Sequence, residues 1–346
     1  MAEALKKQGR ASAWFELLLD VITLVSFVVI IYHALYTFTS YDDIPAVISP
    51  SVPDLAAQSK DAPVVQTGLY IQDFTEFDIV NGKFLVDLKV WFKFDPKKIG
   101  LDKIDQFTFE KADIKAKSEP IITAEGDKLF VAYTMRVLFE LPLNYRTFPF
   151  DDHTLSFTLF HEHLTPAQVK LESTSIVINP RVDITGWKIA RTSARAGYYE
   201  TNVVVGAVHQ KEFHPRAVFS VQFARMSNRH LVSIFLPLLL IFFIALFSFT
   251  FAVKPEEADT INLVDISSAS IFGIVAYRFV IETLSPSVGY FMLSDYIFVF
   301  FLLMTALIFV LNIFAEQFTS LQKNLIVLGL HVLANFFFIY FLIFWI

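Results

Sequence analysis

The sequence predicts a membrane protein of the α+β class, in which a β-sandwich is followed by a bundle of four transmembrane helices and preceded by one more. First, 55% of the 346 residues are hydrophobic and 39 are Phe, which is too apolar for an ordinary soluble protein. Second, residues 64–224 alternate apolar and polar side chains with a period of two, as half-buried strands do. Third, five apolar runs outside this region are long enough to cross a hydrocarbon core of about 30 Å.

Charge, cysteine content and motifs exclude several classes of function. The formal net charge is −6 and the acidic residues are spread along the chain, so we expect no nucleic-acid partner. There is no Cys, which excludes disulfides and Cys-ligated metals. The sequence contains no GxSxG, phosphate-binding loop or HExxH motif. We therefore predict a protein that is not an enzyme and has no cofactor.

Residues 1–38 read as a cytoplasmic tail followed by a transmembrane anchor. Three basic residues, Lys6, Lys7 and Arg10, precede the apolar run and place the N-terminus in the cytoplasm by the positive-inside rule. The run is long and is followed by no small-residue cleavage site, which favours an uncleaved anchor over a signal peptide. Residues 39–63 are rich in Pro, Ser and Asp and predict a linker.

Residues 64–224 are predicted to form an all-β domain outside the cytoplasm. Asn81–Gly82 separates two alternating segments, which is a strong hairpin signal. About eight strands without a helix of ordinary length are typical of a sandwich. Beyond the hairpin, we expect strands at 105–109, 128–141, 153–161, 170–178, 187–194, 198–208 and 217–223.

Residues 225–346 are predicted to hold four spans, at 231–253, 265–284, 291–314 and 325–346. Pro237 lies inside the first, where neighbouring helices can satisfy the freed carbonyl. His331 and Asn335, four residues apart in the last span, are expected to hydrogen-bond to neighbouring helices. Glu16 and Asp20 of the N-terminal span either pair with another helix or reach the interface.

The second of these four spans carries polar residues that a lipid-facing helix would not have. An acid lies near each end of one helical face, and two aromatic residues lie between. Copies of this face around an axis would give carboxylate rings and apolar constrictions that exclude water. The alternative is a buried helix whose polar groups pair with neighbours. The face consists of Asn262, Asp265, Ala269, Phe272, Ala276, Phe279 and Glu282.

Four motifs, in this order and spacing, carry a family resemblance from about Val64 to the C-terminus. They are LPLNYRTFPFDDHTL at 141–155, TGWKI at 185–189, Arg225 with FLP at 235–237, and IETLSP at 281–286. This set resembles the pentameric ligand-gated (Cys-loop-like) ion channels, in particular their bacterial members. The resemblance implies a homopentamer around one pore in the lipids of a bacterial inner membrane, with an immunoglobulin-like β-sandwich in the periplasm.

The resemblance also implies roles for single residues. Asp151 and Arg225 would form a coupling pair between the two domains; alternatively they are ordinary surface charges. Pro149, beside Asp151, and Pro286, in the loop after the pore helix, would belong to the same coupling region. Segment 281–290 would receive the movement. In the pore, Glu282 would lie at the outer mouth, Phe272 and Phe279 at gates, and Asp265 at the cytoplasmic constriction. Carboxylate rings attract inorganic cations, so we expect cation selectivity, with Arg278 turned away and paired with an acid.

Three departures separate the chain from that family. Lys93 stands where the family has an acid, and the following segment is shorter and lacks the Trp-x-Pro-acid motif, so the usual agonist site between subunits is not carried over. Ile274 replaces the histidine of the proton-gated bacterial member, so proton gating through that position is not carried over either. The N-terminal helix has no equivalent in most relatives; it packs outside the ring or recruits another membrane protein.

Two stretches are candidate ligand sites for an agonist, a small molecule or an ion, that the sequence does not identify. His161, Glu162 and His163 are predicted to place both imidazoles on the same side of a strand, for a divalent metal or for titration near pH 6. The alternative is a solvated strand end. Tyr198 and Tyr199, expected between two late strands, would enclose a cationic ligand by cation–π contact, or are ordinary tyrosines.

Two functions remain open on the sequence. One is a cation channel gated by a ligand or ion bound to the periplasmic β-domain. The other is a non-conducting pentameric receptor or scaffold that holds membrane partners through its N-terminal helix. A secondary transporter is disfavoured because there is no inverted repeat.

Overall fold

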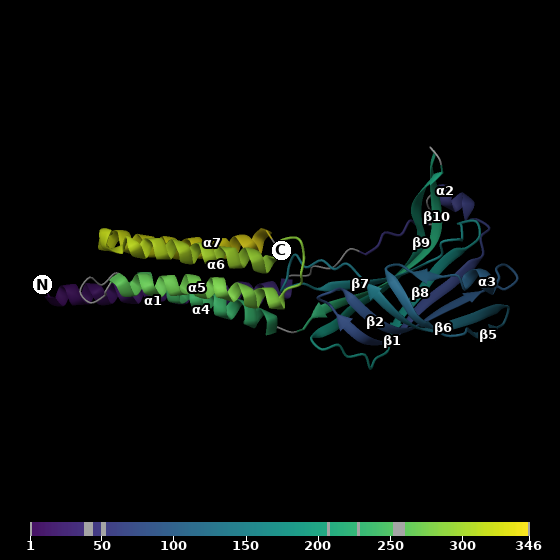
Figure 1. Ribbon diagram of the computed structural model, residues 1–346, viewed down its shortest axis with the longest axis horizontal. Coiled ribbons are helices and arrows are strands. Elements are labelled where there is room, and N and C mark those ends of the chain that lie inside the picture. The colour runs from purple at the N-terminus through teal and green to yellow at the C-terminus, as the bar shows by residue number, and fades with distance from the viewer. Residues whose placement is uncertain are drawn as a thin grey trace. The chain divides into compact units, whose positions relative to one another are not determined.

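The computed structural model describes residues 2–37, 44–49, 53–205, 208–226, 229–251 and 260–344. The chain divides into two compact units (Figure 1). One unit, the helical unit, comprises Met1–Ser40, Tyr145–Asp151 and Ser227–Ile346. The other, the β unit, comprises Tyr41–Asn144 and Asp152–Met226. A β-rich part followed by four apolar helices is therefore the architecture, as the sequence predicts.

The described part of the β unit contains ten strands and two short helices. The helices are α2 (Pro53–Gln58) and α3 (Leu101–Ile104). The strands are β1 (Val64–Asp78), β2 (Lys83–Phe94), β3 (Thr108–Phe109), β4 (Ala112–Lys117), β5 (Ile121–Glu125), β6 (Lys128–Glu140), β7 (His153–Phe160), β8 (Lys170–Ile178), β9 (Trp187–Val205) and β10 (Val208–Arg225).

These strands form two sheets that share one core. In the first sheet the order is β4-β6-β2-β1-β8, with β5 also paired to β6; in the second it is β3-β7-β10-β9. Alternate residues of β1, β2 and β6 point to the same buried core as those of β7 and β10. Phe139 of β6 and Phe157 of β7, with ring centroids 4.8 Å apart, join the two sheets. The apolar face of each sheet is thus covered by the other.

The predicted hairpin is present between β1 and β2. Their pairing closes at Asp78 and Lys83, with Asn81 and Gly82 in the turn. Asp78 accepts hydrogen bonds from the backbone and the side chain of Asn81, and the side-chain bond lowers the pKa of its carboxyl group. Gly82 has φ +65°, a conformation that favours glycine.

Three strand predictions were wrong in detail. Residues 105–109 form a strand only at Thr108–Phe109, and a turn separates this strand from α3. Of the two late strands expected at 187–194 and 198–208, residues 187–205 are one continuous strand, β9, which pairs with β10. β4 and β5 were not predicted, because most of their side chains are exposed and give no apolar period. The linker also contains a short helix, α2, that was not predicted from the sequence.

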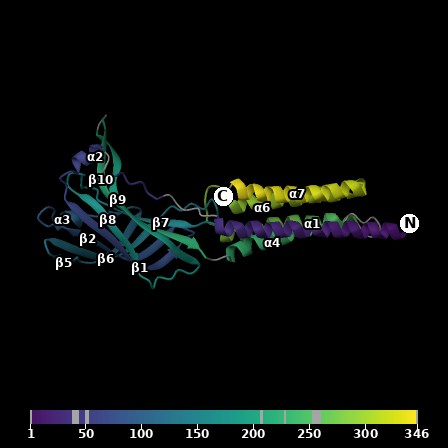
Figure 2. The ribbon, with the colours of Figure 1, turned by 180° about the vertical axis from the view of Figure 1, so that it is seen from behind.

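The described part of the helical unit contains five long helices: α1 (Ala2–Thr37), α4 (Arg229–Phe251), α5 (Thr260–Leu284), α6 (Leu293–Ile313) and α7 (Ser320–Phe344). Among the described residues, four helices are long and apolar enough to cross a membrane, namely α4, α5, α6 and α7. The apolar stretch of α1, Leu17–His33, is shorter. A membrane crossing by α1 therefore stays a prediction. Figure 2 shows α1 alongside α7 within this unit.

Polar contacts hold α4, α5 and α6 together inside the apolar bundle. The amide nitrogen of Asn312 on α6 donates to the hydroxyl oxygen of Ser248 on α4 at 2.8 Å. The hydroxyl of Tyr277 on α5 donates to the backbone oxygen of Ser233 on α4. Buried polar groups in such a bundle find partners on neighbouring helices, which fixes how the helices are rotated.

Candidate functional site

The predicted pore face of α5 is exposed in the chain. Phe272 and Phe279 are 74% and 69% exposed, and the Glu282 side chain is 55% exposed. Asp265, Ala269 and Ala276 are exposed as well, and the side chain of Asn262 lies outside the described ones. The opposite face of α5 is buried against the bundle, at Leu263, Ser267, Ser270, Ile274 and Ile281.

This orientation is unusual for a helix that carries charges. About a fifth (22%) of the α5 span is buried within the chain, against 50% of the α4 span and 39% of the α6 span. The α5 span, which carries Asp265, Arg278 and Glu282, is therefore the one of the four that its own chain covers least, below the 33% of the α7 span. That the exposed face lines a pore stays a prediction.

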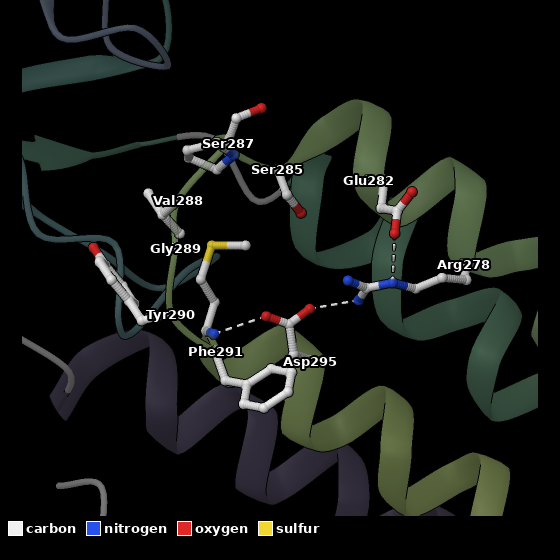
Figure 3. Close-up of a pocket in the computed structure, with 11 residues that line it drawn as sticks. Arg278, Glu282, Ser285, Ser287, Val288, Gly289, Tyr290, Phe291 and Asp295 are labelled. Carbon is white, nitrogen blue, oxygen red and sulfur yellow. Dashed lines mark hydrogen bonds and ion pairs between the residues drawn. The ribbon is translucent and has the colours of Figure 1, made fainter.

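An ion-pair cluster occupies the C-terminal end of α5. The Arg278 guanidinium donates through Nε to Glu282 at 3.0 Å and through another nitrogen to Asp295 of α6. The second Asp295 oxygen accepts the backbone N–H of Met292 at 2.7 Å and so caps α6. Figure 3 shows Arg278 bridging the two carboxylates. The Asp295 side chain is 7% exposed, so this side of the bridge is largely desolvated.

The expectation that Arg278 pairs with an acid is confirmed, but Asp295 was not predicted as its partner. An acid in the first turn of an otherwise apolar span was the available signal, because such a residue needs a cap or a counter-charge there.

A cavity of about 720 Å³ adjoins this cluster. Its wall consists of the α5–α6 connection together with Arg278, Glu282 and Asp295 (Figure 3). Pro286, predicted to lie in the coupling loop, is buried and belongs to this wall. Two carboxylates and one guanidinium leave one negative charge beside the cavity, which favours positively charged occupants over anions.

The loop Tyr145–Asp151 packs on the helices and belongs to the helical unit. The backbone N–H groups of Leu293 and Ser294, at the start of α6, donate to the carbonyl oxygens of Arg146 and Phe148 at 2.8 and 3.1 Å. The hydroxyl oxygen of Tyr290 accepts the backbone N–H of Tyr145 at 3.0 Å.

Within this loop, the Phe148–Pro149 peptide is cis and Pro149 is buried. The ring centroid of Phe150 lies 5.7 Å from that of Phe235 on α4. The loop therefore touches the start of α6 and the first part of α4.

The two residues of the predicted coupling pair belong to different units. Asp151 is fully buried at the end of the loop just described. Arg225 ends β10, where its guanidinium lies 4.4 Å from the Trp187 ring centroid. Its backbone N–H donates to a carboxylate oxygen of Asp152 at 2.8 Å. The neighbouring acid, Asp152, therefore accepts a hydrogen bond from the Arg225 backbone. The pairing of Asp151 with Arg225 stays a prediction.

The expected arrangement of His161 and His163 is wrong. β7 ends at Phe160, so both residues lie in the following loop rather than on one side of a strand. His161 is buried, whereas Glu162 and His163 are exposed. Among the described residues, no group of three or more His, Cys, Asp or Glu side chains is placed to hold a metal ion.

Tyr198 and Tyr199 lie within β9, not between two strands, and point to opposite faces of the sheet. Tyr198 is fully buried and donates its hydroxyl to the Val169 carbonyl oxygen at 3.3 Å, as an ordinary core tyrosine does. Burial raises the pKa of both tyrosines. The Arg216 guanidinium lies 4.8 Å from the Tyr199 ring centroid and covers the ring with a cation of the chain itself.

Comparisons with known proteins assign no family to the chain. No protein-family model matches it, and no curated protein is significantly similar to it in sequence.

Proposed function

We propose that the chain is one subunit of a cation-selective ion channel, in which α5 helices from several copies line a common water path. The observation that carries this proposal is the exposed face of α5, with its carboxylates and its two phenylalanines. By resemblance, the assembly is a pentamer in a bacterial inner membrane, with an immunoglobulin-like sandwich in the periplasm. A ligand or ion bound to that sandwich would open the pore.

The membrane environment explains why this face needs a water path. An ionised carboxylate exposed to hydrocarbon is costly, so intramembrane acids face protein or water. The bundle of the same subunit covers the opposite face of α5, so it does not shield Asp265 or Glu282. Copies arranged around an axis would place these acids in water.

The charges at the end of α5 support cation selectivity. Asp295 binds the Arg278 guanidinium on the α6 side, so Arg278 is shared between Asp295 and Glu282 rather than neutralising Glu282 alone. Each subunit then contributes one net negative charge at this level. A ring of such charges raises the local concentration of cations and lowers that of anions.

Phe272 and Phe279 supply the closed state. Their exposed rings lie two helical turns apart on the pore face, between the levels of the two acids. A ring of phenyl groups in a narrow pore makes it unfavourable for water to stay, and ions do not pass a dry segment. Opening requires these rings to separate or rotate.

The loop Tyr145–Asp151 is suited to transmit that movement. It lies between β6 and β7 along the chain, and its backbone carbonyl oxygens accept hydrogen bonds from the start of α6. A shift of this loop would move the α5–α6 connection and, with it, the end of the pore helix. A ligand that binds one arrangement of the β unit more tightly would thereby change the open population.

Current recordings on the purified chain in planar bilayers test this proposal. Phe272→Ala is expected to leave the pore leaky, whereas Phe336→Ala on α7, which removes a similarly exposed ring (65%) from a helix outside the pore, leaves the current unchanged.

In the same recordings, Asp265→Asn and Glu282→Gln should each shift the reversal potential in a salt gradient toward lower cation preference. The matched control is Asp127→Asn, an exposed acid in the β5–β6 turn. Absence of current with Phe272→Ala under every pH, divalent ion and amine applied would refute the channel and favour the receptor or scaffold.

A further inference from the structure

A set of polar side chains joins α1 to α7. Nε2 of His331 lies 3.4 Å from a carboxylate oxygen of Asp20, and Nδ1 of His331 lies 2.8 Å from the Thr23 hydroxyl oxygen. The Asn335 amide nitrogen donates to the Thr23 hydroxyl oxygen at 3.0 Å. The Ser26 hydroxyl donates to the Asn335 amide oxygen. These five residues are called the α1–α7 polar ladder below.

The ladder is closed off from its surroundings. Asp20, Thr23 and His331 are 4%, 1% and 3% exposed. One turn along, the ring centroids of Phe27 and Phe338 are 3.8 Å apart. Phe27 also lies 6.4 Å from rings of α4 and of α6, so α1 contacts three helices of the bundle.

Neither helix could leave the other without cost. A separated α7 would present His331 and Asn335 to lipid, and a separated α1 would present Asp20, Thr23 and Ser26. Hydrocarbon offers no hydrogen-bond partner for these groups, so separation would leave them unsatisfied. The two helices therefore complement each other group by group.

The described side chains of α1 that lie next to the ladder and are exposed match lipid rather than a second protein surface. Between Leu17 and Val29, where the structure describes every side chain of α1, the exposed residues are aliphatic and none is charged. They are Leu17, Leu18, Val21, Ile22, Leu24, Val25, Val28 and Val29. The polar groups of Asp20, Thr23 and Ser26, by which this part of α1 could recognise another membrane protein, are already engaged on α7.

We propose that His331 and Asn335 form a helix-recognition surface on α7, specific for a membrane helix with an acid and two hydroxyl residues at three-residue spacing. Its occupant is α1 of the same chain. α1 is then a fifth helix of the bundle rather than a free anchor. Because the linker that leads to β1 follows α1 in the chain, the contact with α7 also fixes the start of this linker. This proposal does not depend on ion conduction.

Cross-linking in the full-length protein tests the proposal, because the chain has no cysteine of its own. Phe27→Cys with Phe338→Cys should react with a short bis-maleimide and give a cross-link within one chain, seen as a monomer of altered mobility. In this double-cysteine variant, a further Asp20→His substitution places two imidazoles next to each other, and a further His331→Asp substitution places two carboxyl groups next to each other. Each is expected to lower the cross-linking rate about tenfold, a coupling of about 1.4 kcal/mol.

The combined Asp20→His and His331→Asp variant restores the pair with its partners exchanged and should return the rate close to that of the parent. The control is Thr305→Val, which removes a buried hydroxyl of α6 that bonds only its own helix, to Phe301 at 2.7 Å. It should leave the rate unchanged.

A rate insensitive to the ladder variants, or lowered equally by Thr305→Val, would overturn the proposal. Failure of the exchanged pair to recover would also overturn it, because recovery depends on specific pairing and not on fold stability alone. A cross-linked dimer in place of the monomer would show that the occupant is α1 of a second copy and would contradict assignment to the same chain.

Discussion

Asp295 determines where the positive charge of Arg278 lies. Its carboxylate binds Arg278 with one oxygen and the Met292 backbone with the other, and it is nearly buried. Glu282, by contrast, is more than half exposed. The two acids that share one guanidinium therefore have different environments, and their removal should have different costs.

We predict that Asp295→Asn destabilises the helical unit by about 3 kcal/mol, because it leaves Arg278 without its buried counter-charge. Glu282→Gln should cost about 1 kcal/mol or less, because water screens an exposed pair. Thermal unfolding in one detergent, followed by helical circular dichroism, compares the two variants. Equal midpoints would contradict the assignment of Asp295 as the main partner of Arg278.

His161 should make the stability of the β unit depend on pH. Burial, and to a smaller extent the charge of Lys117, lower the pKa of His161 to about 4. An unfolded chain binds this proton near pH 6.5, so between about pH 6.5 and 4 the unfolded state holds more protons than the folded state. Stability must then fall as the pH is lowered through this window, by up to about 3 kcal/mol.

The measurement is the unfolding midpoint at several pH values for the parent, His161→Gln and His163→Gln. His161→Gln should flatten the pH dependence, and His163→Gln, at the exposed neighbour, should not. If His163→Gln removed the dependence instead, the buried position of His161 would be wrong.

At the scale of elements, the turn between β1 and β2 sets the register of the first sheet. A Cβ atom at Gly82 would lie 2.4 Å from the Leu141 carbonyl oxygen, and φ is +65°. Gly126, in the β5–β6 turn, has φ +63° but nothing within 4 Å of such an atom. Comparing substitutions at Gly82 and Gly126 therefore separates the cost of backbone strain from the cost of a steric clash.

Gly126→Ala is expected to cost about 1 kcal/mol, from backbone strain alone. Gly82→Ala should cost about 3 kcal/mol, since the clash with backbone adds to the strain. Denaturant unfolding of the β unit, followed by tryptophan fluorescence, gives both values. Equal losses would mean that the Leu141 contact does not constrain the turn.

The elements that the sequence predicts well are those with one buried face. β2 alternates buried and partly exposed residues along its whole length, so its period is visible in the sequence. β5 is exposed at every position, and residues 105–109 divide between a turn that follows α3 and a two-residue strand. Such elements are defined by pairing with distant strands, which a local pattern does not report.

In the candidate site, too, the local pattern predicts some features and tertiary contacts determine the others. Helical spacing predicts which residues of α5 share a face, because that depends only on position along one helix. Spacing does not reveal that Asp295 would bind Arg278, or that His331 would meet Asp20, since both contacts join separate helices. Intramembrane polar residues could be recognised as needing partners, but the partner is a tertiary property.

For the whole molecule, what surrounds the charged face of α5 in the assembled protein decides whether a water path exists. The chain covers one face of this helix and leaves the charged face open. If α5 lines a water path, that face meets water in the assembly. The exposed faces of α6 and α7 carry aliphatic and aromatic side chains, such as Leu303 and Phe336, and are expected to meet lipid.

Block of the current by a charged, water-soluble thiol reagent tests this claim most directly, because the parent chain has no cysteine. We predict that bilayer currents through Ala276→Cys, on the exposed face of α5, fall when the reagent is added. Currents through Leu303→Cys on α6 should not change. Unchanged current at Ala276→Cys, with the reagent shown by mass to have reacted at neither position or only at Leu303→Cys, would contradict a water path along α5.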